Sequence, residues 1–225
     1  ESGREDFVIS TDAEELSERL RIVQEPVPIQ PIGQGLTLPG STTSSVSLTL
    51  LADLSPPVVG GQILVATSLT VTSSYALVSY ARLGPAYGGA VDVVDLSDPS
   101  APVLASQVVF PNADINAAFI SGDNLYLAQA GEDLGFNETA AIQNLGFSGG
   151  LVNTSTNIRV PLAGNIATSV IVDTSTVYAT SAANGAVYAL DRGTMSVTAS
   201  VAVADARWVD TDGARVAVHG GDTLH

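Results

Sequence analysis

Two short motifs carry residue types that are associated with catalysis. Residues 146–150, GFSGG, match the Gly-x-Ser-x-Gly spacing of a nucleophile elbow, and acidic residues and then His219 follow it in hydrolase order. An elbow works only where a strand turns into a helix above a parallel sheet. Residues 151–162, LVNTSTNIRVPL, predict a strand instead. We therefore interpret GFSGG as a Gly-rich turn, and His219, alternating with valines, as a structural strand residue.

The second motif is DTDG at residues 210–213, in which Asp210 and Asp212 could begin a calcium-binding loop. A loop of the EF-hand type needs further oxygen ligands and a distal bidentate Glu, and none follows at that spacing. Asp-Gly also favours a tight hairpin turn. We expect a turn, with calcium as the alternative, and we expect no other cofactor.

The composition limits the partners of the chain. Its 225 residues carry a net charge of −15, all eight basic residues are Arg, and Cys is absent. An acidic surface repels nucleic acid and anionic lipid, so neither is an expected partner. The absence of Cys excludes disulfides and thiolate-ligated metals. No apolar run is long enough to insert into a membrane, although association through an anchor outside this sequence stays compatible.

The N-terminal residues 1–44 differ from the rest of the chain. A capping-box spacing between Thr11 and Glu14 predicts one helix within residues 1–24. Residues 24–43 are rich in Pro, Gly and Thr, which predicts an extended tether or strap. The chain begins at Glu1 without a signal segment, as a processed exported protein or a trimmed segment would.

Residues 45–225 consist of repeated β-hairpins. Repeat units start near residues 69, 118, 170 and 207, with the sequences LTVTSSYALVSYA, AFISGDNLYLAQA, VIVDTSTVYATSA and the looser RWVDTDGARVAVHGG. In each unit a β-branched residue precedes a turn, and these residues, Val71, Ile120, Val172 and Val209, are 49, 52 and 37 positions apart. A period of about 40–50 residues is typical of the four-stranded blade of a β-propeller.

A second hairpin follows the first in each unit. GAVDVVDLSD from Gly89 aligns with GAVYALDRGT from Gly185, which places Asp95 over Asp191 as a second turn cap. The sequence from Gly150 is taken as a degenerate middle copy. This alignment leaves an insertion over residues 131–150, which we predict to be a projecting loop.

The predicted loop is the candidate binding site. Its apolar anchors and amides are Phe136, Asn137, Gln143, Leu145 and Phe147. Long loops on a rigid repeat scaffold commonly carry binding residues. The alternative is a loop that packs back on its own blade.

Residues 91–107, VDVVDLSDPSAPVLASQ, followed by SGDNLYLAQAG at residues 121–131, resemble the LVIVD-repeat family of bacterial and archaeal extracytoplasmic β-propellers. The resemblance is close only over residues 91–130. It implies an exported propeller, and it implies no catalytic residues.

The repeats predict an all-β propeller of three and a half to four blades, with an N-terminal helix and a Pro-rich strap. Closed propellers have four to eight blades. We therefore expect a larger ring, completed by further blades of a longer protein or by a partner, unless the sheets form another fold; the first alternative is favoured.

The function predicted from these features is non-enzymatic. We expect an exported protein-binding or scaffolding subunit at the cell surface or in an extracytoplasmic complex. One alternative is a periplasmic propeller enzyme, a metal-dependent lactonase or a quinone-type dehydrogenase, whose site lies partly in other blades. Another is a structural subunit of a surface layer or filament that uses open sheet edges.

Overall fold

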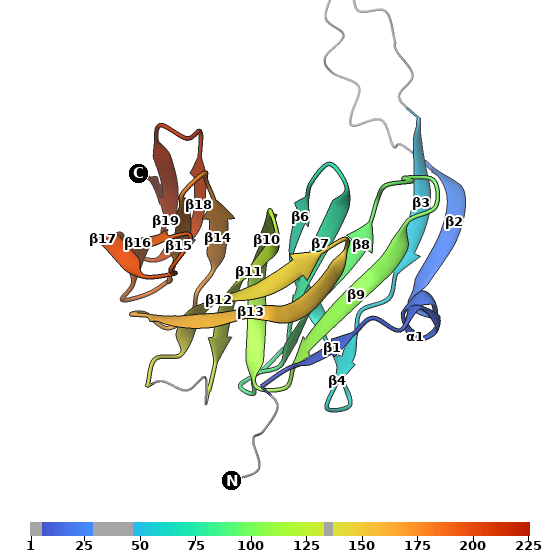
Figure 1. Cartoon of the computed structure of the whole chain (residues 1–225), viewed down its shortest axis with the longest axis horizontal. Helices are drawn as coiled ribbons and strands as arrows, with labels where there is room; N and C mark the ends of the chain where they lie inside the picture. The colour runs from blue at the N-terminus through green and yellow to red at the C-terminus, as the bar shows by residue number, and fades with distance from the viewer. Residues whose placement is uncertain (1–5, 29–46, 133–136) are drawn as a thin grey trace, which may run out of the picture.

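A computed structural model describes residues 6–28, 47–132 and 137–225 (Figure 1). The described elements, in chain order, are β1 (Val8–Ser10), α1 (Ala13–Ser17), β2 (Leu20–Val27), β3 (Leu48–Leu54), β4 (Val58–Val59), β5 (Gln62–Ile63), β6 (Val65–Val71), β7 (Tyr75–Ala81), β8 (Gly89–Asp95), β9 (Val103–Phe110), β10 (Ala113–Ser121), β11 (Asn124–Gly131), β12 (Ala140–Ser148), β13 (Leu151–Leu162), β14 (Ser169–Val172), β15 (Thr176–Thr180), β16 (Ala186–Asp191), β17 (Val197–Ala202), β18 (Ala206–Thr211), β19 (Val216–Gly220) and β20 (Thr223–Leu224). No described helix has the length and apolarity needed to cross a membrane.

Four antiparallel sheets form the blades of a β-propeller, as the repeats predict. Blade 1 contains β6–β9 and adds β1 at its outer edge, blade 2 contains β10–β13, blade 3 contains β14–β17, and blade 4 contains β18–β20. In Figure 1, blade 1 lies at the right, blade 2 in the middle, and blades 3 and 4 together at the left. Two further two-stranded sheets, β2–β3 and β4–β5, belong to the N-terminal part of the chain.

Successive blades pack face to face. We call the face of a blade that points toward the preceding blade its leading face, and the opposite face its trailing face. Between blades 1 and 2, Leu77, Val91 and Phe110 pack against Ile115 and Leu127. Equivalent clusters lie between blades 2 and 3 and between blades 3 and 4. Middle strands such as β8 and β12 are therefore buried on both faces, which explains their nearly continuous apolar sequences.

Close packing fixes the residue that begins β8. A Cβ atom on Gly89 would lie 2.7 Å from the backbone oxygens of Tyr80 and Ala113 and from the nitrogen of Ile115. Only glycine leaves room for the chain of blade 2 to cross at this point. The Gly-apolar-Asp pattern of the repeat thus begins with a packing requirement.

The strand registers confirm most of the repeat alignment. The last pair before the inner turn is Val71 with Ala76 in blade 1, and the pairs Ile120–Leu125 and Val172–Val177 are equivalent. In blade 4 this pair is Thr211–Val216, so the predicted equivalence of Val209 was wrong by two positions. The alignment of Asp95 with Asp191 is confirmed, because they pair with the equivalent residues Tyr75 and Thr176.

The predicted projecting loop was wrong over most of its length. Residues 140–148 form β12, the third strand of blade 2, and β13 from Leu151 is the fourth strand rather than a degenerate second hairpin. The connection between β11 and β12 covers only residues 132–139, close to the span 82–88 that joins β7 to β8 in blade 1. The misalignment arose because β12 lacks the Gly-Ala-Val start of its equivalents.

The predicted N-terminal helix is much shorter than expected. Among the described residues of this region, the helix covers Ala13–Ser17, and its N-cap is Asp12, whose Oδ1 accepts hydrogen bonds from the backbone N–H groups of Glu14 and Glu15 at 2.9 and 3.3 Å. Residues 20–27 form β2 instead. Ile22, Val23 and Val27 are β-branched residues that favour a strand. Residues 29–46, which include most of the predicted strap, lie outside the described part of the chain.

The N-terminal segment covers part of the leading face of blade 1. Leu16 of α1 and Leu54 of β3 pack with Val94 and Leu104. Val59 and Leu64 pack with Tyr80 and Ala90. β2–β3 forms a ribbon that extends along the right edge of the molecule in Figure 1. The predicted boundary at residues 44/45 is thus crossed by the β2–β3 pairing.

Candidate functional site

The GFSGG motif lies in the β-hairpin that joins β12 to β13. Gly149 and Gly150 have positive φ angles of 58° and 85°, and Ser148 is exposed at the turn. The Gly150 carbonyl accepts a hydrogen bond from the Oγ of Ser106 at 2.8 Å, which docks the turn on β9 of blade 1. A hairpin has none of the strand-to-helix geometry of a nucleophile elbow. The interpretation as a Gly-rich turn is confirmed.

Asp212 caps the β18–β19 turn. Its Oδ1 accepts hydrogen bonds from the backbone N–H groups of Ala214 and Arg215 at 2.9 and 2.7 Å, and these bonds lower the pKa of the carboxyl. Asp210 lies within β18, where its Oδ1 accepts from the N–H of Thr211 at 2.8 Å. Within residues 6–28, 47–132 and 137–225, no three His, Cys, Asp or Glu side chains lie close enough to hold a metal. Calcium at Asp210 and Asp212 stays an untested prediction.

Of the five residues predicted to bind through a loop, the four that the structure describes do not share one surface. Three of them, Gln143, Leu145 and Phe147, are buried in β12. The Phe147 ring packs edge-on against the Tyr75 ring, with the two ring centroids 5.2 Å apart. Asn137 is exposed in the β11–β12 connection. Phe136 lies outside the described residues. Strand β12 pairs with β11 on one side and with β13 on the other. Gln143 and Leu145 are therefore interior residues of the sheet and are not available on a loop surface.

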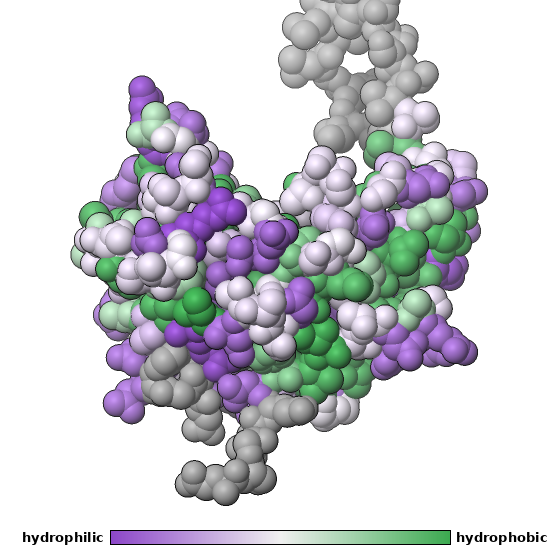
Figure 2. Space-filling view, in the orientation of Figure 1, coloured by the Kyte–Doolittle hydropathy of each residue, from purple (hydrophilic) through white to green (hydrophobic). Residues whose placement is uncertain are grey.

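The innermost strands of the four blades line a central hollow. Its walls are formed by residues of β6, β10, β14 and β18, including Thr70, Phe119, Ile171, Trp208 and Asp210. Figure 2 shows a notch between the lobe of blades 3 and 4 at the left and the rest of the molecule. In a propeller, the innermost strands are where ligands can contact several blades at once, which makes this hollow a candidate binding site.

Polar side chains at the hollow are already used to join blades. Thr67 Oγ1 donates to the Ile115 carbonyl of blade 2 at 2.6 Å, and Asn116 Nδ2 donates to the Ala167 carbonyl at 2.9 Å. Thr168 Oγ1 donates to the Ala206 carbonyl of blade 4 at 3.1 Å. The strand registers make the three donors equivalent. Blades 1, 2 and 3 therefore each bind the following blade through a side chain at the same position.

A buried polar pair recurs on the leading face of each of the first three blades. The pairs are Tyr80 with Asp92, Gln129 with Gln143, and Ser181 with Tyr188, at positions equivalent by register. In blade 2, Gln129 Nε2 donates to Gln143 Oε1 at 2.7 Å. In blade 3, Ser181 and Tyr188 both donate to the Ala163 carbonyl, at 2.6 and 3.0 Å.

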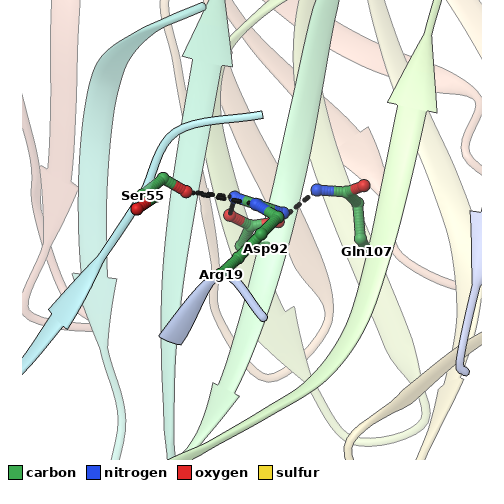
Figure 3. Close-up of polar contacts among 4 residues, drawn as sticks. All are labelled: Arg19, Ser55, Asp92 and Gln107. Atoms are coloured by element: carbon green, nitrogen blue, oxygen red, sulfur yellow. Dashed lines mark hydrogen bonds and ion pairs between the residues drawn. The ribbon is translucent and has the colours of Figure 1, made fainter. Parts of the chain in front are cut away.

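In blade 1, Asp92 of the polar pair binds Arg19 of the N-terminal segment (Figure 3). The Asp92 carboxylate, fully buried, accepts from both terminal nitrogens of Arg19 at 3.0 and 2.5 Å and from Gln107 Nε2 at 2.7 Å. Arg19 also donates to the Ser55 carbonyl at 2.7 Å. Burial, and then the Asp92 charge, raises the pKa of Tyr80. The Asp92 carboxylate thus accepts three hydrogen bonds within the protein, and it anchors the N-terminal segment to blade 1.

The ribbon β2–β3 carries five exposed large apolar side chains. Its exposed large side chains are Ile22, Val27, Leu48, Leu50 and Leu51. Green apolar surface marks β2 at the right edge of Figure 2. A two-stranded ribbon in water is marginally stable by itself, so this surface is suited to cover by another protein.

Sequence reasoning missed both the Arg19–Asp92 anchor and the ribbon. The available signal was Asp92, a carboxylate in the centre of the apolar run GAVDVVD, because a buried charge needs a partner. No signal in the sequence identified Arg19 as that partner, since the two residues are far apart in the chain.

Comparison with known proteins assigns no family to the chain. No protein-family model matches it, and no curated protein shows significant sequence similarity to it.

Proposed function

We propose that the chain is a non-enzymatic, protein-binding or scaffolding β-propeller of an extracytoplasmic complex, and that the ribbon β2–β3 is its contact surface. The observation that carries this proposal is the exposure of large apolar side chains along both ribbon strands. Exposed apolar clusters on a rigid scaffold mark protein-interaction sites.

The occupant proposed for the ribbon is an extended segment of a partner protein. The β2–β3 sheet has two strands among the described residues, so each strand has an outer edge that can accept another strand. Strand addition supplies backbone hydrogen bonds, and alternating side chains such as Leu48 and Leu50 supply apolar contacts. It would also convert a marginal two-stranded sheet into a more stable one.

The absence of a catalytic role is supported by how the polar groups are used. The side chains of Thr67, Asn116 and Thr168 at the central hollow bind backbone carbonyls between blades. The buried Asp92 is neutralised by Arg19. Export and a place at the cell surface are part of the proposal, and the resemblance of residues 91–130 to LVIVD repeats supports them.

The experiment is cross-linking followed by mass spectrometry in the extracytoplasmic fraction of the native host. The expected result is a partner whose cross-links concentrate within residues 20–27 and 48–54. The double variant Leu48→Ser/Leu50→Ser is expected to lose that partner, because it removes two apolar contacts without touching the blades.

The matched control is Leu83→Ser, which removes an exposed leucine from the β7–β8 connection. This variant is expected to keep the partner. Loss of the partner with both variants, or cross-links confined to the blades, would contradict the proposed role of the ribbon.

A further inference from the structure

The ring of blades is open between blade 4 and blade 1. Within the molecule, the innermost strand of each blade covers the trailing face of the blade before it: β10 packs on β6–β8, β14 packs on β10 and β11, and β18 packs on β14–β16. Among the described elements, β18 has no comparable packing against β6. Two blade faces are consequently left without a neighbouring blade.

The first open face is the leading face of β6. Leu69 is 65% exposed, whereas its equivalents in blades 2, 3 and 4, namely Ala118, Val170 and Val209, are 1%, 5% and 2% exposed. Val71 on the same face is also exposed. The N-terminal segment covers β7–β9 but leaves these β6 side chains uncovered. In the other blades, this strand surface lies against the preceding blade.

The second open face is the trailing face of blade 4. Trp208 is 51% exposed, and its equivalent in blade 3, Ser169, is buried and accepts a hydrogen bond from the Val209 N–H at 3.4 Å. Leu224 pairs with His219 on the same face and is exposed. An exposed Trp and Leu on one sheet face form an apolar surface of the kind that another blade covers elsewhere in this molecule.

In each of the three internal interfaces, the trailing face of one blade packs against the leading face of the next. The two open faces are one trailing face, on blade 4, and one leading face, on blade 1. We propose that they join two copies of this chain, with the trailing face of blade 4 in each copy covering β6 of the other. This contact continues the internal series of interfaces. A two-fold axis would close the pair into a ring of eight blades, within the usual range for propellers. The proposal does not depend on the ribbon or its partner.

Arg207 is the blade 4 equivalent of the side chains that hydrogen-bond successive blades. It occupies the position of Thr67, Asn116 and Thr168 and lines the central hollow, and its Nη2 pairs with Asp205 at 2.8 Å. A guanidinium has five N–H donors, so donors remain for a second acceptor. The equivalent acceptor in a second copy is the Ala66 carbonyl, one residue before Thr67.

The acidity of the chain sets the conditions for assembly. Each copy carries a net charge of −15, so two copies repel each other at low ionic strength. Salt screens this repulsion, and the Debye length falls from about 30 Å at 0.01 M to about 8 Å at 0.15 M. Dimerisation is therefore expected to strengthen as salt rises, opposite to an association driven by charge attraction.

The first test is sedimentation equilibrium of the purified chain at low and high salt. The expected result is a species of about 46 kDa, twice the 22.9 kDa monomer, that increases with salt. Leu69→Glu and Trp208→Glu are each expected to raise the dissociation constant at least about 100-fold, since each places a charge in an apolar contact. Val103→Glu, on an exposed apolar residue of β9, is the matched control and should dimerise normally.

Cysteine cross-linking tests the geometry, because the chain has no native Cys. Mixing Leu69→Cys with Trp208→Cys is expected to give a disulfide-linked heterodimer, and mixing Val103→Cys with Trp208→Cys is not. A monomer at every salt concentration, or open-ended polymers, would overturn the two-copy ring. A disulfide within one chain of the double variant would also overturn it, because the ring would then close on itself.

Discussion

Arg19 and Asp92 form a two-point ion pair between the N-terminal segment and the middle of blade 1. Arg19 Nη1 and Nη2 lie 3.0 and 2.5 Å from the two carboxylate oxygens, and the Asp92 side chain is fully buried. A two-point guanidinium–carboxylate pair fixes orientation as well as charge. The N-terminal segment is therefore an integral part of the folded unit, even though blades 2–4 are built without such a segment.

Arg19→Met is predicted to destabilise the protein by about 3–5 kcal/mol, because it leaves the Asp92 carboxylate buried without its cation. Urea unfolding measures the change in the free energy of unfolding. The double variant Arg19→Met/Asp92→Asn is expected to recover part of the loss, because the buried charge is then removed.

Arg21→Met is the control for this prediction. Arg21 pairs with Asp53 at 3.4 Å, and both side chains are exposed. Exposed ion pairs contribute about 0–1 kcal/mol. Equal losses for Arg19→Met and Arg21→Met would contradict the assignment of Arg19 as the anchor.

Asp191→Asn is predicted to make the stability less dependent on acid pH. Asp191 Oδ1 accepts hydrogen bonds from the N–H and Oγ1 of Thr194 at 2.8 and 2.9 Å and from the Gly193 N–H at 3.1 Å, and these bonds hold its pKa below the ordinary value of 3.8. The native state thus favours the ionised form. Its stabilising contribution is complete above pH 3.8 and is lost as the pH falls through the lowered pKa. Unfolding of the two proteins between pH 2 and pH 7 measures this difference.

Asp114→Asn is predicted to change the pH dependence of stability in the opposite direction. Burial raises the pKa of Asp114, although its Oδ1 accepts from the N–H groups of Arg82 and Gly88 at 3.2 and 3.0 Å. Ionisation costs stability as the pH rises from the ordinary value through the raised pKa. Asp114→Asn is therefore expected to gain stability relative to the wild type over that window. The same pH trend for both variants would refute the explanation.

Thr67→Val is predicted to weaken the contact between blades 1 and 2 by about 1 kcal/mol, since it removes the donor to the Ile115 carbonyl and keeps the side-chain shape. Thr67→Ser retains the hydroxyl and tests whether the donor matters. If Thr67→Ser and Thr67→Val lower the free energy of unfolding by the same amount, the Thr67–Ile115 hydrogen bond contributes nothing to stability.

Phe147→Ala is predicted to destabilise the protein by about 3–5 kcal/mol, because the ring is buried between blades 1 and 2 against Tyr75. Asn137→Ala, at an exposed residue of the neighbouring connection, is expected to change stability by less than about 0.5 kcal/mol. Thermal unfolding distinguishes the two. A silent Phe147→Ala would restore the hypothesis of a projecting binding loop.

The sequence was sufficient to predict the blades, because each inner hairpin repeats its β-branched residue, turn and second strand. Val71, Ile120 and Val172 were aligned correctly for this reason. Strand β12 was missed because its sequence, AAIQNLGFS, has Ala140 and Gly146 where the repeat has its first glycine and its closing Asp, and because it carries the buried amide Gln143. Buried amides look like loop residues when their partners are unknown.

Long-range pairing explains the other errors. Residues 20–27 contain charged residues at helical spacing, and only the pairing with β3 stabilises them as a strand. Nothing local in the sequence identifies that pairing, or the contact of Arg19 with Asp92, because both depend on the folded positions of distant segments. The candidate loop depended entirely on the alignment and failed with it.

The central claim is that the ribbon β2–β3 is a surface for another protein. Hydrogen–deuterium exchange tests it most directly. The exchange of the isolated chain is compared with and without the partner that the cross-linking experiment identifies. The prediction is fast exchange in residues 20–27 and 48–54 of the free protein, slow exchange in β8 and β12, and selective slowing of the ribbon on binding. Slowing confined to the blades, with the ribbon unchanged, would contradict the claim.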